Sequence, residues 1–295
     1  MMDFHLRVIA GLAALALITI GCTGDRGADA SGPLVIGGIP DQDLELLEER
    51  FDGLAEYLAD ELDVEVVYQP SVDYAAIVTA FANGDIHLGW FGALTGVQAA
   101  AETPGANVLA QRPLDANFVS TFIVGGDVEA ETIEDLVGHT FTFGSESSTS
   151  SHVMPRFFLQ EAGIDPEDDF SQVTYSGAHD IVLQLVEAGS FDAGVVSTEV
   201  WERAVREDEV DFDRVRELWT TPPYANYHWL SHPDLDDRFG DGVTQRLQEA
   251  LLAAGDDAQA RDYVLMFEDD RFIEASAEEL EPLEEIAREL GLIGE

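Results

Sequence analysis

Short apolar strand patterns alternate with amphipathic helical patterns along most of the chain. Leu34-Val35-Ile36 is a buried-strand run that ends in Gly37-Gly38, and apolar residues then recur at helical spacing from Leu44 to Leu58. A second strand run, Val64 to Tyr68, precedes helical spacing from Tyr74 to Phe81. Such alternation is typical of mostly parallel sheets with helices on their faces. We therefore expect an α/β protein.

Two segments of the sequence resemble each other. Residues 78–86 end one predicted helix and open a strand, and residues 185–193 do the same. A new helix begins near a Thr after each, at Thr95 and Thr198. Two similar α/β lobes would produce this repeat.

Two extended stretches are suited to connect the lobes. They are Asn117 to Val124 and the Pro-rich run Thr220 to Ala225. Lobe 1 is then expected to comprise residues 34–115 plus 224–295, and lobe 2 residues 116–223, with a hinge near 113–119 and 220–226. The amphipathic segments 243–254 and 277–290 are expected to pack back over lobe 1.

The N-terminus is typical of an exported lipoprotein. Arg7 precedes an apolar run, Val8 to Ile20, that is too short to span a bilayer and fits a signal peptide. The following Cys22 completes a sequence that resembles a bacterial lipobox, which predicts a signal peptide over 1–21, lipidation of Cys22 and a tether over 22–33. The alternative is an ordinary secretory signal with a chance Cys. We expect the extracytoplasmic face of the membrane, in a periplasm or at the cell surface, with a lipid anchor as the only membrane contact.

The charge of the chain excludes several functions. All 14 basic residues are Arg, against 59 acidic residues, for a net charge of −45. This excess of acid excludes nucleic acid and anionic membrane as electrostatic partners. Because the acids are spread along the whole chain, the pattern favours adaptation to concentrated salt, where the Debye length falls to about 3 Å at 1 M. The absence of Lys excludes P-loop, kinase and Schiff-base chemistry, and Cys22 alone cannot form an internal disulfide.

A hydroxyl-rich loop follows the strand pattern Phe141-Thr142-Phe143. Six Ser and Thr side chains occupy positions 145 and 147–151, after Gly144 and before a new helical pattern. A strand, a small-residue loop and a helix start together form an anion site, because free backbone N–H groups and the positive end of the helix dipole point into the loop. Arg is absent between Val124 and Met154, so dipoles would provide the recognition. The alternative is a Ser-rich capped turn.

Five motifs occur in an order that is typical of one family. They are VDYAAIV at 72–78, GWFG at 89–92, STS at 148–150, GAHD at 177–180 and FDA through STE at 191–199. Together they resemble the phosphonate/phosphite-binding substrate-binding lipoproteins of ABC importers, which have the type II periplasmic-binding-protein fold. The resemblance covers about residues 34–235. GIPDQD at 38–43 and WFGALTGVQ at 90–98 resemble more closely a branch assigned to selenate binding.

The resemblance implies a set of ligand-binding residues. Tyr74, Ser148, Thr149, Ser150, His179 and Glu199 fall on family positions. Phe91 is also expected to contact the ligand, although it lacks the hydroxyl of the Tyr that the family has there, and the family Asp ahead of Trp229 is missing near Asn226. In aminophosphonate binders that Asp and the Glu pair with the ligand's ammonium, so its loss favours a smaller oxyanion. We add Tyr224, beside Pro222-Pro223, as a residue that could reach the cleft.

The resemblance also implies partners and a mechanism. A small tetrahedral oxyanion, phosphite or phosphonate first, binds between lobes that close around it, and a permease and its ATPase on separate chains recognise the closed form. We expect a monomer without cofactor, metal or catalytic residues. A phosphate-like monoester has a second pKa near 6, so Glu199 could accept its remaining proton. If Glu199 turns away, a selenate- or sulfate-like dianion is the alternative.

Two other classes of function are less consistent with the sequence. A hydrolase would use a Ser of the 145–151 loop with His179 and Asp180, but the loop breaks the G-x-S-x-G pattern, and adjacent side chains at a helix start diverge. A metal site would use His228 and His232. Their segment reads as a strand, where residues four apart are well separated.

Overall fold

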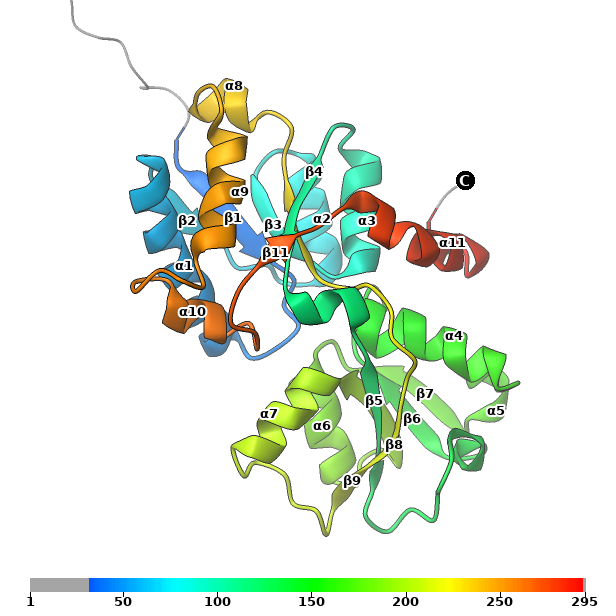
Figure 1. Cartoon of the computed structure of the whole chain (residues 1–295). Helices are drawn as coiled ribbons and strands as arrows, with labels where there is room; N and C mark the ends of the chain where they lie inside the picture. Colours follow the sequence, from blue (N-terminus) through cyan, green and yellow to red (C-terminus); the bar gives the residue numbers. More distant parts are fainter. Residues whose placement is uncertain (1–31, 294–295) are drawn as a thin grey trace, which may run out of the picture.

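The computed structural model describes residues 32–293 (Figure 1). The predicted signal peptide, Cys22 and nearly all of the tether lie outside the described residues. Within the described range, no helix is long and apolar enough to cross a membrane. Two β-sheets with helices on their faces make up this part of the chain. We call the part built on the first sheet lobe 1 and the part built on the second sheet lobe 2.

The first sheet has six strands in the order β11-β4-β10-β3-β1-β2. They are β1 (Leu34–Gly38), β2 (Val66–Tyr68), β3 (Leu88–Phe91), β4 (Asn107–Gln111), β10 (His228–Ser231) and β11 (Ile273–Glu274). The second sheet has five strands in the order β7-β6-β8-β5-β9. They are β5 (Ser120–Gly125), β6 (Thr140–Phe143), β7 (Gln172–Tyr175), β8 (Ala193–Ser197) and β9 (Val215–Thr220). Strands of both sheets therefore form where the sequence patterns predicted them.

The α-helices cover the faces and ends of these sheets (Figure 1). Those of lobe 1 and the C-terminal segment are α1 (Leu44–Leu62), α2 (Tyr74–Ala82), α3 (Ala93–Glu102), α8 (Leu235–Phe239), α9 (Val243–Ala253), α10 (Arg261–Leu265) and α11 (Glu281–Glu289). Those of lobe 2 are α4 (Met154–Glu161), α5 (Pro166–Asp169), α6 (His179–Glu187) and α7 (Thr198–Arg206). Capping fixes where several begin: the carboxylate of Asp43, for example, accepts the backbone N–H of Glu45 at 2.9 Å at the start of α1.

The two sheets share one topology. Strands β2-β1-β3-β10-β4 of the first sheet occupy the same places as β7-β6-β8-β5-β9 of the second. The repeated sequence segments fall on the equivalent units α2–β3–α3 and α6–β8–α7. The weak sequence repeat therefore reflects a repeat in topology.

The expectation of mostly parallel sheets is wrong. β1 is parallel to β2 and β3, and β6 is parallel to β7 and β8. In contrast, β10 and β5 are antiparallel to both of their neighbours, and β11 is antiparallel to β4. β5 and β10 are the strands that follow the two connections between the lobes. A strand that arrives from the other lobe starts at the edge where the parallel strands end, so it runs in the opposite direction.

The two connections lie side by side. Phe118 and Tyr224 pair as an isolated antiparallel bridge, with N–H to O distances of 2.8 and 2.9 Å in the two directions. Asp115 adds a second tie, because its carbonyl accepts the N–H of Asn226 at 3.0 Å. The connections therefore form one two-stranded link between the lobes.

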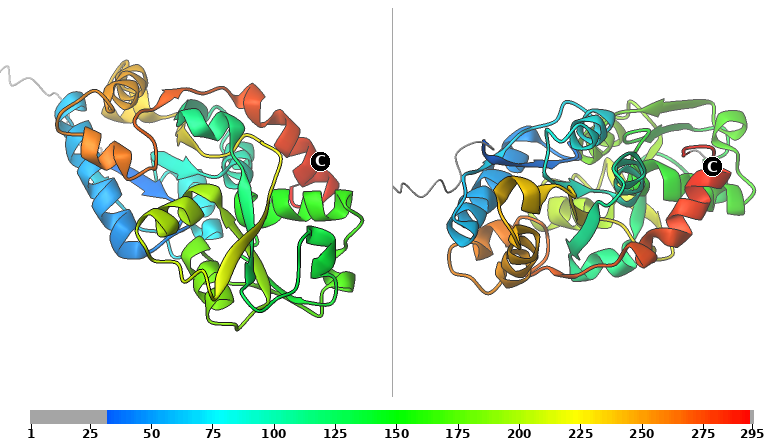
Figure 2. Two further views of the ribbon diagram at one scale, coloured as in Figure 1. Left: turned by 60° about the horizontal axis from the view of Figure 1, so that its bottom comes forward. Right: turned by 90° about the horizontal axis from the view of Figure 1, so that it is seen from above.

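The C-terminal helix contacts more than lobe 1. α9 packs in the lobe 1 core through Val243 and Leu247, as expected. α11 instead contributes Leu283 to a hydrophobic cluster that also holds Leu94 of α3 and Met154 of α4 (Figure 2). The prediction that both segments pack over lobe 1 is therefore confirmed, because α11 packs against α3, but α11 also contacts lobe 2 through α4. An amphipathic pattern identifies the apolar face of a helix but not the surface that it covers.

Candidate functional site

Helices begin where parallel strands end, at the edge of each sheet that faces the other lobe. α2 follows β2 and α3 follows β3 in lobe 1, while α4, α6 and α7 follow β6, β7 and β8 in lobe 2. Ligands of open α/β sheets bind outside the carboxyl ends of the strands. The positive ends of these helix dipoles favour an anion there.

Residues 148–151 of the hydroxyl loop are buried at this edge, and the loop contacts lobe 1 as well as lobe 2. Ser148 caps a π-helical turn, Thr149–Val153, and its hydroxyl oxygen accepts the N–H of Ser151 at 3.1 Å. The hydroxyl oxygen of Thr149 accepts the N–H of Leu94, at the start of α3 in lobe 1, at 2.9 Å. Both hydroxyl oxygens therefore act as acceptors from the protein, which leaves each hydroxyl proton free to be donated. These protons are two potential donors to an anion.

The loop requires a glycine before it. A side chain at Gly144 would place its first carbon 2.0 Å from the Ser151 hydroxyl oxygen. Gly144 also donates its N–H to the carbonyl of Ser151 at 3.0 Å. The close approach lets the end of β6 pack directly against the buried π-helical turn, and turns of this type are frequent at functional sites.

His179 presents an N–H group to the loop. Its Nδ1 accepts the N–H of Ser197 at 3.0 Å, so in the neutral ring the proton is assigned to Nε2. Nε2 lies 3.5 Å from the hydroxyl oxygens of both Ser150 and Tyr227, at the limit of hydrogen bonding. Burial lowers the pKa of His179 to about 4. The residue is therefore a neutral donor near neutral pH.

His87, His152 and His228 are buried like His179, and burial lowers the pKa of each to about 4. Because an unfolded His has a pKa near 6.5, the unfolded state binds more protons between pH 6.5 and 4. We expect the free energy of unfolding to fall as the pH is lowered from 6.5 to 4, by up to about 3 kcal/mol per His. Urea titrations at constant salt and several pH values measure this decrease. The substitution His87→Gln, which lies away from the hydroxyl loop, should make the free energy of unfolding less dependent on pH. A pH-independent stability would contradict the prediction.

Lobe 1 contributes Tyr74 and a second tyrosine, Tyr227. The Tyr74 hydroxyl is buried at the start of α2 and has no hydrogen-bond partner among residues 32–293. Burial, reinforced by the charge of Asp41, raises the Tyr74 pKa well above its ordinary value, and the neighbouring Ser148 opposes the rise. The Tyr227 hydroxyl donates to Asp41 Oδ2 at 2.8 Å. Tyr74, Tyr227, His179 and the hydroxyl loop therefore form one buried polar cluster, which we call the hydroxyl cluster.

Glu199 is engaged by an arginine. Its Oε1 lies 3.3 Å from both Nη1 and Nη2 of Arg112, which precedes the first connection between the lobes. Arg112 also donates to the carboxylate of Asp115 through Nε and Nη2, at 2.7 Å each, and to the carbonyl of Phe267 at 2.6 Å. Burial raises the pKa of Glu199 to about 7, and Arg112 opposes that rise. The predicted ligand-facing carboxylate thus takes part in an ion pair between the lobes.

Phe91 and Tyr224 have structural contacts. The Phe91 ring packs edge-on against Phe81 in the lobe 1 core, with centroids 5.4 Å apart. The Tyr224 hydroxyl is bonded to Ser120, whose hydroxyl donates to the Ser150 carbonyl at 2.6 Å. Tyr224 therefore supports the backbone of the hydroxyl loop, and its ring packs beside Phe118.

One face of α7 holds lobe 2 against lobe 1. Glu199, Arg203 and Arg206 are spaced by four and three residues, so they share this face. Arg203 donates to the side chain of Gln42, and Arg206 Nη2 donates to Glu268 at 2.8 Å. With the Arg112–Glu199 pair, these contacts make a polar interface between the lobes.

Sequence reasoning did not assign a role to Asp41, Arg112, Asn226 or Tyr227. Asp41 lies inside the motif GIPDQD at 38–43, which was the sequence feature that could have identified it as a site residue. Asn226 Oδ1 accepts the N–H of Ala93, at the start of α3, at 3.3 Å. In the described part of the chain, no group of three or more His, Cys, Asp or Glu side chains is arranged to hold a metal ion.

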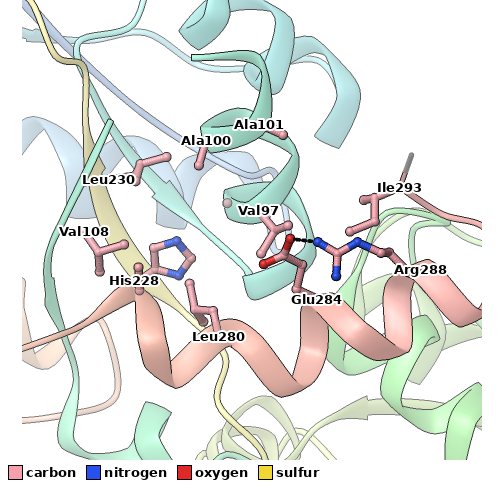
Figure 3. Close-up of a pocket in the computed structure, with 12 residues that line it drawn as sticks. Val97, Ala100, Ala101, Val108, His228, Leu230, Leu280, Glu284, Arg288 and Ile293 are labelled. Carbon is pink, nitrogen blue, oxygen red and sulfur yellow. Dashed lines mark hydrogen bonds and ion pairs between the residues drawn. The ribbon is translucent and has the colours of Figure 1, made fainter. Parts of the chain in front are cut away.

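A separate cavity of about 450 Å³ lies between α3, β10 and α11 (Figure 3). Its lining is mainly apolar and includes Val97, Leu230 and Leu280, with the Glu284–Arg288 pair beside it. His228 lines the cavity from β10. None of the residues of the hydroxyl cluster lines this cavity, so it is distinct from the candidate site.

The family model described as "ABC transporter, phosphonate, periplasmic substrate-binding protein" matches residues 36–280. The chain belongs to this family. It is 39% identical over 268 residues to a protein of Prochlorococcus marinus (strain MIT 9301) named "Probable ABC transporter phosphite binding protein PhnD1", with 88% of this chain and 90% of the relative covered. It is also 23% identical to the "Phosphate-import protein PhnD" of Mycolicibacterium smegmatis, covering 92% of this chain and 87% of the relative.

Solved structures agree with the assignment. PhnD1 from P. marinus in complex with methylphosphonate superposes with a TM-score of 0.85, covering 88% of this chain and 98% of the other. A binding component of a phosphonate ABC transporter from Pseudomonas aeruginosa gives 0.77 at 17% identity, with 86% and 85% covered, and supports the fold alone.

The family assignment confirms the predicted fold and the predicted class of protein. The chain is a periplasmic, and therefore extracytoplasmic, substrate-binding component that works with an ABC transporter. Members of this family are binding proteins, which supports the reading without catalysis over the hydrolase alternative.

Proposed function

We propose that this protein binds a small tetrahedral phosphorus oxyanion, phosphite or a short phosphonate, in the hydroxyl cluster between its lobes. One observation carries the proposal: neutral donors from both lobes converge in a buried cluster, and the Tyr74 hydroxyl there has no partner in the described range. The names of the 39% identical relative and of its methylphosphonate complex support the same ligand class.

The cluster favours an oxyanion without an ammonium group. In aminophosphonate binders the resemblance places a carboxylate for the ammonium ahead of Trp229, and that carboxylate is missing near Asn226. Glu199 is taken by Arg112 at 3.3 Å. Tyr74, Ser148 and His179 in contrast offer hydrogen-bond donors that carry no charge and suit phosphorus oxygens.

The mature chain is proposed to act as a monomer, anchored through a lipid on Cys22 and adapted to concentrated salt. The lipobox sequence supports the lipid anchor, and the even distribution of acid supports the adaptation to salt. Mass spectrometry of the intact mature protein would detect the lipid. The lobes are proposed to open on the paired connections near Phe118 and Tyr224, which would admit the anion.

Thermal unfolding in molar KCl tests the ligand. Phosphite or methylphosphonate at 100 times its Kd should stabilise the protein by about 2.7 kcal/mol. Aminoethylphosphonate, sulfate and selenate at the same concentration should leave the melting temperature unchanged. A shift with selenate or sulfate alone would support the selenate-like alternative instead, and no shift with any anion would refute the function.

A further inference from the structure

The carboxylate of Asp41 is buried beside the hydroxyl cluster and is only half satisfied. Asp41 lies between β1 and α1 and is 2% exposed. Its Oδ2 accepts the Tyr227 hydroxyl at 2.8 Å, and its Oδ1 has no partner among the described residues. Buried polar groups are almost always hydrogen-bonded. Oδ1 is therefore placed to accept a hydrogen bond from a bound molecule.

The backbone of Asp41 fixes this position relative to lobe 2. Its carbonyl accepts the N–H of His179 at 3.0 Å. His179 Nε2 in turn lies 3.5 Å from both Tyr227 and Ser150. Successive contacts of 2.8, 3.5 and 3.5 Å thus link Asp41 through Tyr227 and His179 to Ser150. An anion bound by the Ser150 hydroxyl would therefore lie near the Asp41 carboxylate.

The charges around Asp41 come from several elements. Groups that interact electrostatically with it are Arg50, Tyr68, Tyr74, His179, Asp180, Glu199 and Tyr227. Arg50 is the cation of this set. Its guanidinium is buried, lies 4.7 Å from the Phe267 ring centroid, and has two nitrogens without partners in residues 32–293. Arg50 therefore places a positive charge in the surroundings of the Asp41 carboxylate.

We propose that Asp41 Oδ1 accepts a hydrogen bond from the protonated oxygen of the ligand, so that the site selects monoprotonated oxyanions over fully ionised dianions. This inference rests on the proposed function, because it places the ligand in the hydroxyl cluster. Tyr74, Ser148 and His179 donate to the unprotonated oxygens. Sulfate and selenate dianions have no proton to donate, so the carboxylate would repel them.

Asp41 suits this role better than the two other carboxylates near the hydroxyl cluster, Glu199 and Asp180. Glu199 is held by Arg112 at 3.3 Å and belongs to the interlobe ion pair. Asp180 also has an oxygen without a partner in the described part of the chain, but it is only half-buried. Asp41 alone of the three is bonded to Tyr227, next to the Nε2–H of His179.

Calorimetric titration with methylphosphonate between pH 5.5 and 9, at constant KCl, tests the proposal. For the wild-type protein, affinity should fall about tenfold per pH unit above the second pKa of the ligand, as the monoprotonated form disappears. Asp41→Asn should weaken binding about 10- to 100-fold at pH 6, the loss of one hydrogen bond to a charged group. The variant should also lose the pH dependence and gain measurable binding of sulfate.

Matched variants separate Asp41 from its neighbours. Glu45→Gln removes the same charge from an exposed position on α1 and should leave the profile unchanged. Asp180→Asn should also retain the wild-type profile. A wild-type affinity for methylphosphonate that does not depend on pH overturns the proposal without any variant, as does a profile that changes with Asp180→Asn instead. If wild type binds no oxyanion at all, the proposed function itself fails, which is a distinct result.

Discussion

Replacing Ser148 and Thr149 together with alanine is expected to weaken anion binding by about 10²- to 10⁴-fold. Each hydroxyl accepts a backbone N–H from the protein, Ser151 N–H for Ser148 and Leu94 N–H for Thr149, so its own proton is available to the ligand. A hydrogen bond to a charged group contributes about 1.5–3 kcal/mol, and two such bonds give this range. Titration calorimetry with methylphosphonate at constant salt and pH measures the change.

The same loop supplies the control. Ser147 is a half-buried hydroxyl residue one position before Ser148, and its backbone N–H donates to the Ser145 hydroxyl oxygen at 3.3 Å. Ser147→Ala should therefore bind as the wild type does. Ser148 also caps the π-helical turn, so the double variant should lose about 1 kcal/mol of stability as well. Unchanged affinity in a folded double variant would show that the hydroxyl loop does not hold the anion.

Local patterns in the sequence were sufficient to predict the α/β class and the hydroxyl loop. β1, α1 and α2 follow the periodicity of their apolar residues, and the strand–loop–helix order around Gly144 is visible without a structure. Because helix starts gather at the carboxyl ends of parallel strands, a loop of this kind is directed towards the site by topology.

Strand direction and long-range pairing could not be predicted in the same way. The apolar pattern of β5 is the same whichever way the strand runs, and only its entry from the other lobe makes it antiparallel. Glu199 was assigned to the ligand, yet its partner Arg112 lies 87 residues away. Asp41 and Tyr227 meet across 186 residues. Such pairs leave no periodic signal in a single sequence.

Arg112→Ala is expected to destabilise the protein by about 3–5 kcal/mol, because removing one partner of a buried ion pair leaves uncompensated charge. The guanidinium is 4% exposed and bonds to Asp115, Glu199 and the Phe267 carbonyl. It also lies 4.9 Å from the ring centroid of Tyr227. Urea unfolding of both proteins at several pH values measures the difference.

The Arg112 variant should also respond to pH in a defined direction. The pKa of Glu199 is already raised to about 7 by burial, and Arg112 is the cation that opposes the rise. A raised pKa of a carboxyl in the folded state makes the protein less stable as the pH increases up to that pKa. Without Arg112 the pKa of Glu199 should rise further, so this loss of stability should continue above pH 7. The penalty for Arg112→Ala should therefore be larger at pH 8 than at pH 6, and Glu199→Gln in the same background should reduce that difference.

Arg288 provides the comparison that decides whether burial of the pair matters. It pairs with Glu284 one turn away on α11, where the two side chains are 44% and 36% exposed. Exposed pairs contribute about 0–1 kcal/mol, so Arg288→Ala should change stability by about 0.5 kcal/mol or less. Equal losses for Arg112 and Arg288 would contradict the structural role of Arg112. Arg112 donates to the Asp115 carboxylate at the first connection, and the Asp115 carbonyl accepts the Asn226 N–H of the second connection. A large loss of stability for Arg112→Ala alone would therefore establish that the paired connections between the lobes depend on this buried arginine.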